Sequence, residues 1–193
     1  MTLKEIFNQY FRKKLLIGGS IGIVAALVRL FGGHETSFAF AATLLLFFII
    51  VALIIGFIDY RFYEISAPKI IAKLIDKEPL YSFQNYGFTK HEEQQLEGQI
   101  NNYKIILSPL TNMERVNVLM VLIPLQIREG LDRYFKTYDE HFKLCLSDEI
   151  ILAEATFKNY ENVFDYNKLF NLIDRTTLSL RENKIEPLNI VDD

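Results

Sequence analysis

The chain has 193 residues; 50% are hydrophobic, and 21 basic side chains stand against 24 acidic ones. This length leaves room for one domain of ordinary size beside short membrane segments, because single domains run to roughly 100–200 residues. Residues 1–61 contain six basic and three acidic side chains, so the remaining 15 basic and 21 acidic ones lie in residues 62–193. An acidic domain lacks the basic surface that neutralises phosphates, which argues against nucleic acid as a partner.

The first fourteen residues predict a short amphipathic helix. Its apolar and aromatic side chains recur at intervals of three and four: Leu3, Ile6, Phe7, Tyr10 and Phe11. Such a segment either lies along the inner headgroup layer as an interfacial helix or extends the span that follows it. We favour the interfacial arrangement for residues 1–14.

Two apolar segments follow and predict a transmembrane hairpin over residues 15–58. Residues 15–31 contain one charge, Arg29, which lies near the end of the segment, where a long side chain reaches the headgroups. Residues 38–58 contain no charge, and a helix of this length spans about 30 Å of hydrocarbon. A second span so soon after the first argues against a cleaved signal peptide.

Basic residues flank the hairpin on one side. Arg12, Lys13 and Lys14 precede the first segment and Arg61 follows the second, whereas the loop 32–37 has no Lys or Arg. Lys and Arg collect on the cytoplasmic side of membrane spans. We therefore expect a multi-pass protein of the cell (inner or plasma) membrane, with the lipid bilayer as a partner and with both termini in the cytoplasm.

Small residues spaced four apart form a stripe on each span. They are the candidate residues for helix packing in the membrane: Gly18, Gly22, Ala26, Ala52 and Gly56. Small side chains let two helices approach closely. The stripe either packs the hairpin on itself, which we favour, or joins the hairpins of several copies.

Residues 62–182 predict a cytoplasmic α+β domain. A helix is expected to begin at Ser66 and to stop at Pro79. Period-two patterns then predict two β-hairpins and one strand that is apolar on both faces and therefore buried on both sides. The expected strands are residues 94–100, 103–110, 116–125, 142–146 and 149–157.

Helical spacing returns at residues 131–142 and 166–180. The complete order is helix, three strands, helix, two strands, helix. It predicts an antiparallel sheet of about five strands with three helices against it. Residues 183–193 predict a flexible acidic tail.

Short motifs in this domain also carry a resemblance. They are the helix 68–76, which reads PKIIAKLID, the hairpin around Gly98 and Tyr103, and the strand that begins at Ser147. With the two preceding spans, the chain resembles an uncharacterised family of bacterial membrane proteins, a domain of unknown function, which implies no activity. The order of elements is similar to that of secretion-chaperone-like domains, and this implies protein binding and dimerisation.

No motif predicts catalysis. His34, His91 and His141 are not spaced as metal ligands, and the glycines at 18–22 lie inside an apolar span rather than in a phosphate-binding loop. The lone Cys145 stands in a stretch of alternating apolar residues and is expected to pack there. We therefore expect a protein that is not an enzyme and has no catalytic residue, no cofactor and no metal.

These patterns favour a membrane-anchored adaptor or accessory protein. Its cytoplasmic domain is expected to bind another protein or to form a homo-oligomer, because a sheet with helices on one face needs a partner on the other. The alternative is a signal-gated effector that disrupts or perforates the membrane, for instance in bacterial defence, with a ligand-sensing cytoplasmic domain.

Overall fold

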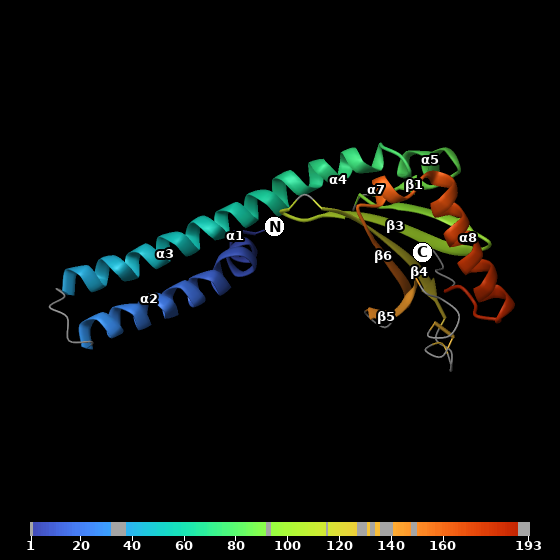
Figure 1. The fold of residues 1–193 in the computed structure, drawn as a ribbon. Coiled ribbons are helices and arrows are strands. Elements are labelled where there is room, and N and C mark those ends of the chain that lie inside the picture. The colour runs from blue at the N-terminus through green and yellow to red at the C-terminus, as the bar shows by residue number, and fades with distance from the viewer. Residues whose placement is uncertain are drawn as a thin grey trace. The chain divides into compact units, whose positions relative to one another are not determined.

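The computed structural model divides the chain into two compact units, Met1–Ser66 and Ala67–Asp193. The first, called the hairpin unit, is helical, and the second, the α+β unit, contains an antiparallel sheet with helices (Figure 1). The α+β class expected from the sequence is confirmed. The structure describes residues 2–31, 38–91, 94–114, 116–126, 131, 134, 135, 141–147 and 150–188.

Two long helices make up the hairpin: α2 (Lys13–Phe31) and α3 (Phe38–Tyr60). They have 19 and 23 residues, so their lengths are roughly 28 and 35 Å at 1.5 Å per residue. Both lie in helices long and apolar enough to cross a membrane. The two apolar segments of the sequence are therefore helical over the expected residues.

The chain is already helical ahead of α2. Helix α1 (Leu3–Ile6) begins at a capping box, in which Thr2 and Glu5 each accept a hydrogen bond from the other's backbone N–H. The π-helix η1 (Phe7–Arg12) joins α1 to α2, and the helix runs from Leu3 to Phe31. The N-terminal segment is therefore helical, as expected, and continuous with the helix of the first apolar segment.

A second π-helix, η2 (Arg61–Ser66), follows α3, and α4 (Ala67–Ile75) begins at the next residue. The prediction that Ser66 caps a new helix is wrong, because the residues before it are already helical. Helix α4 also ends four residues short of Pro79. Pro79 is instead the N-cap of a short helix that the sequence did not predict, α5 (Leu80–Asn85).

Two helices close the α+β unit: α7 (Tyr160–Val163) and α8 (Tyr166–Glu182). Helix α8 begins after Asp165, whose carboxylate accepts a hydrogen bond of 2.8 Å from the backbone N–H of Lys168. Such a cap satisfies one of the free N–H groups at a helix start. The predicted helix over 166–180 is confirmed, whereas the one over 131–142 falls largely outside the described residues.

The sheet has six strands in the order β1-β2-β3-β4-β6-β5, and every neighbouring pair is antiparallel. The five expected strands are present, and the sixth is a two-residue strand at the edge of the sheet. Two residues are too few to show a period, so the sequence pattern could not reveal that strand. The strands are β1 (Thr89–Lys90), β2 (Leu96–Ile100), β3 (Tyr103–Thr111), β4 (Asn117–Leu125), β5 (Lys143–Ser147) and β6 (Ile150–Lys158).

The turn between β2 and β3 is the predicted asparagine turn. Asn101 and Asn102 have φ angles of 54° and 71°, as a primed two-residue hairpin turn requires. The side-chain amide of Asn101 also donates hydrogen bonds of 2.8 and 2.9 Å to Asp174 and Thr177 of α8. The tip of this hairpin is therefore fastened to the last helix.

One face of the sheet forms the core. Its residues on β4 (Leu119, Val121, Ile123 and Leu125) are fully buried, and the core includes apolar side chains of α4, α5 and α8. Figure 1 shows α5 and α8 together on one side of the sheet. The expectation that β4 is buried on both sides is wrong, because Val118, Met120 and Leu122 on its other face are only partly buried.

The segment after α8 is packed rather than loose. Ile185 is 5% exposed, and its carbonyl accepts a hydrogen bond from the hydroxyl of Tyr103. The backbone N–H of Leu188 donates to the carbonyl of Pro124 at 3.2 Å. The predicted flexible tail is therefore wrong for residues 183–188, and residues 189–193 lie outside the described part of the chain.

Candidate functional site

The predicted packing residues lie where α2 meets α3. A Cβ atom added at Gly18 would come within 2.9 Å of the Cβ of Ala52, and one at Gly22 within 2.9 Å of Leu45 Cδ1. Two backbones approach this closely only where side chains are small. Gly18 and Gly22 therefore lie against α3 within one hairpin, while Ala26 is only partly buried.

Gly56 also lets two helical segments approach closely, at the base of the hairpin. An added Cβ atom there would lie 2.6 Å from the ring of Phe11 and 3.0 Å from the carbonyl oxygen of Tyr10. The second contact involves backbone, which cannot move aside like the end of a side chain. The structure thus joins the end of α3 to η1, a pairing that the glycine pattern alone did not reveal.

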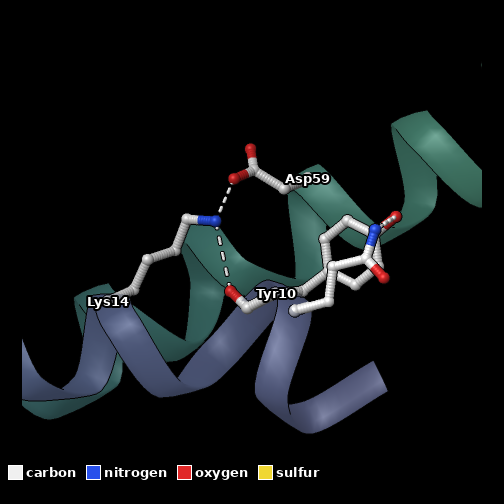
Figure 2. A network of polar contacts seen from close by, with 4 residues as sticks. Tyr10, Lys14 and Asp59 are labelled. Carbon is white, nitrogen blue, oxygen red and sulfur yellow. Dashed lines mark hydrogen bonds and ion pairs between the residues drawn. The ribbon is translucent and has the colours of Figure 1, made fainter. Parts of the chain in front are cut away.

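A group of polar contacts holds the same end of the hairpin and is called the base cluster here: Tyr10, Lys14, Asp59 and Glu64. Figure 2 shows the ammonium of Lys14 directed at the carboxylate of Asp59, with which it forms an ion pair, and at the carbonyl oxygen of Tyr10. The hydroxyl of Tyr10 donates a hydrogen bond of 2.6 Å to Glu64 and accepts one of 3.1 Å from Gln9. These contacts bridge positions as far as 54 residues apart.

Tyr10 is the centre of this cluster and was missed as a site residue. It is 6% exposed, although its neighbours on η1 are mostly exposed. Its ring lies 5.7 Å from that of Tyr60 in an edge-on arrangement and 6.5 Å from that of Tyr63. The sequence signal that could have indicated this cluster is the opposite charge of Lys14 and Asp59, because an antiparallel hairpin places these two residues side by side.

A second feature lies on the α+β unit, where the sheet face opposite the core carries apolar side chains. We call it the open face, and its central pair is Ile106 of β3 opposite Leu122 of β4. None of its members belongs to the hydrophobic core. The apolar residues of the open face are Ile106, Leu110, Val118, Met120, Leu122 and Leu152.

Charged residues border the open face on both sides. On β2 and β3, Glu97 and Lys104 form an ion pair of 2.7 Å. On β5 and β6, Lys143 stands opposite Glu154 in the strand register. Lys158 of β6, opposite Val118, lies on the same face, so the open face is apolar at its centre and carries charges of both signs at its borders.

Cys145 does not pack as the sequence suggested. It is exposed, because Leu144, the residue before it, packs against the hydrophobic core, and successive side chains of a strand point to opposite faces. A hollow of about 570 Å³ lies beside it. Its lining residues are His141, Lys143, Leu144, Cys145, Glu154, Thr156 and Phe157.

Among the described residues, no group of three or more His, Cys, Asp or Glu side chains is arranged to hold a metal ion. What the molecule offers instead is a close-packed helical hairpin with a polar base, and an open apolar sheet face.

Comparison with known proteins adds no relative: no protein-family model, no curated protein and no solved structure matches the chain. The resemblances drawn from the sequence motifs stay predictions. The open face and the base cluster are therefore the features from which a function is argued.

Proposed function

We propose that this chain is a membrane-anchored, non-enzymatic adaptor whose α+β unit self-associates, with a second copy of the chain covering the open face. The observation that carries the proposal is the apolar row on that face. Apolar sheet surface in contact with water is unfavourable, and two sheets pack face to face about 10 Å apart when each covers the other.

The anchoring half of the proposal is supported by the surface of the hairpin. Apolar side chains on α2 and α3 are exposed, among them Leu16 at 64%, Phe47 at 57% and Ile54 at 53%. A helix that is apolar all round and not covered by protein is suited to lipid. The basic residues beside the base cluster favour a cytoplasmic position for that end and for the α+β unit.

The charge pattern is the reason for choosing a second copy as the occupant. Both borders of the open face hold a lysine and a glutamate: Glu97 with Lys104, and Lys143 with Glu154, the second border also containing Lys158. In a two-fold arrangement the same patch lies on both sides, so these cations and carboxylates can face one another. A partner with charges of a single sign would meet repulsion as well as attraction at these borders.

Membrane anchoring would further promote this contact. Copies held in one bilayer have a higher effective concentration for one another than copies in solution. A modest interface on the α+β unit is therefore sufficient for association in the membrane.

The test is the mass of the detergent-solubilised full-length protein, measured by light scattering after size exclusion. We expect a dimer for the wild type and a monomer for Met120→Glu, because the new carboxylate would be buried without a partner between two apolar faces. The matched control is Val163→Glu, which places the same charge at an apolar side chain that is 56% exposed on α7. The control is expected to remain a dimer.

Two results would contradict the proposal. A monomeric wild type without any bound protein would refute self-association. A Met120→Glu variant that still assembles would show that the contact between copies lies outside the open face. The hairpins would then be the segments that associate. That outcome would favour the gated membrane effector, whose toxicity to induced cells provides a second measurement.

A further inference from the structure

The base of the hairpin carries cations that form no ion pair with any described carboxylate. The described carboxylates of the hairpin unit are already engaged: Glu5 with Thr2, Asp59 with Lys14, and Glu64 with Tyr10. Four basic side chains near them are exposed, and none forms an ion pair with a described carboxylate. They are Lys4, Arg12, Lys13 and Arg61.

Aromatic side chains lie at the same level of the hairpin. The rings of Phe7 and Phe11 are stacked at 6.4 Å, and that of Tyr10 lies between those of Tyr60 and Tyr63 at 5.7 and 6.5 Å. Tyr side chains collect at the headgroup level of membrane proteins, since one end is apolar and the other polar. The rings therefore mark the headgroup level independently of the charges.

The free cations fall within this aromatic layer. Arg12 and Lys13 directly follow Phe11, and Arg61 directly follows Tyr60. The contacts between Lys14 and Asp59 and between Tyr10 and Glu64 bring these two segments level with each other. In the proposed membrane arrangement, the guanidinium and ammonium groups that remain exposed would lie at the height of lipid phosphates.

We propose that Arg12, Lys13 and Arg61 bind the phosphate headgroups of anionic phospholipids in the leaflet on this side of the membrane. A guanidinium presents two parallel N–H donors that match two phosphate oxygens, and the ammonium of Lys13 adds a point charge. Lys14 takes no part, because Asp59 and the Tyr10 carbonyl occupy its ammonium. The inference rests on the proposed membrane anchoring.

The test is native mass spectrometry of the full-length protein in detergent, titrated separately with phosphatidylglycerol, phosphatidylcholine and inorganic phosphate. The wild type is expected to retain phosphatidylglycerol about tenfold better than phosphatidylcholine, since each basic residue near an anionic headgroup adds attraction. The triple variant Arg12→Gln, Lys13→Gln, Arg61→Gln is expected to lose this preference. Inorganic phosphate at the same concentration is expected not to displace the lipid.

A matched control changes the same number and kinds of charge on α8: Lys168→Gln, Arg175→Gln and Arg181→Gln, all of which are exposed in the native chain. This variant is expected to keep the preference. Equal retention of the two lipids by the wild type, or loss of preference in the α8 control, would overturn the inference. Displacement by inorganic phosphate would assign the site to free phosphate and overturn the lipid assignment.

Membrane fractionation separates this inference from the proposal beneath it. A protein that washes off membranes in alkaline carbonate would refute the anchoring itself. A protein that stays in the membrane yet shows no lipid preference would refute only the headgroup site.

Discussion

Tyr160 lies in the core of the α+β unit with 1% of its surface exposed. Its hydroxyl has no hydrogen-bond partner in the part of the chain that the structure describes. A buried hydroxyl without a partner lowers the free energy of unfolding by about 1–3 kcal/mol, because it loses its hydrogen bonds to water and gains none in the folded state. Burial also disfavours the phenolate, so the pKa of Tyr160 is raised above its ordinary value.

Replacing Tyr160 with Phe removes the hydroxyl and keeps the ring. We expect the opening free energy of β4, measured by native-state hydrogen exchange near neutral pH, to rise by about 1 kcal/mol. Tyr103→Phe is the opposing comparison, since its hydroxyl donates to the carbonyl of Ile185 and its loss should be destabilising. A destabilised Tyr160→Phe variant would show that the hydroxyl has a partner after all.

The raised pKa of Tyr160 also predicts how the thermal stability of the Tyr160→Phe variant depends on pH above neutrality. The folded state keeps the proton of Tyr160 to a higher pH than the unfolded state, so the unfolded state is favoured once pH exceeds about 10. Below that pH this side chain contributes no pH dependence. Thermal melts from pH 8 to 11 should therefore fall less steeply for Tyr160→Phe than for the wild type, and parallel curves would refute the effect of burial.

At the scale of elements, the packing of α3 against η1 depends on a missing side chain. Gly56→Ala puts a Cβ atom 3.0 Å from the carbonyl oxygen of Tyr10 and 2.6 Å from the ring of Phe11. The helices must move apart, and such overpacking typically costs about 1–3 kcal/mol. We expect a lower thermal midpoint for the hairpin in detergent, followed by the helical circular dichroism signal.

Gly19→Ala is the matched control on the neighbouring helix. A Cβ atom at Gly19 has nothing within 4 Å, so the substitution should leave the midpoint unchanged or raise it slightly through better helix propensity. If the two variants melt alike, the close approach of α3 to η1 contributes little.

Elements whose signals are local could be predicted from the sequence. The turn at Asn101 and Asn102 was predicted because asparagine tolerates positive φ. The two long helices were predicted because residues 15–31 contain a single charge and residues 38–58 contain none. Contacts between distant positions could not be predicted. Tyr10 reaches Glu64 across 54 residues, and no periodicity within either segment records that pairing.

Cys145 shows a different limit of prediction from the sequence. The apolar alternation around it was read correctly as a strand, yet the side of the sheet to which the cysteine points follows from the register with β6. A shift of one residue in such a register exchanges the two faces. The open face, which carries the proposed function, was likewise expected as excess apolar surface, but its charged borders required the pairing of strands.

At the scale of the whole molecule, the two compact units divide between Ser66 and Ala67. Every residue of the hydrophobic core cluster lies at Ile75 or beyond, so the core of the α+β unit is complete without the hairpin. We expect residues 67–193 alone to unfold cooperatively. Their amides in β3 and β4 should have the same hydrogen-exchange protection as in the full chain, and exchange at the rate of an unstructured peptide would contradict this.

The bond between Tyr103 and Ile185 joins positions 82 residues apart. During synthesis from the N-terminus, the hairpin unit has all its partners once η2 has been made, whereas β3 and β4 must wait for α8 and the segment at Ile185. Contacts of long sequence separation form late, and unpaired strands are prone to aggregate in the meantime. We therefore expect the hairpin to be complete before the sheet, so that β3 and β4 stay incompletely packed until α8 and the segment at Ile185 have been made.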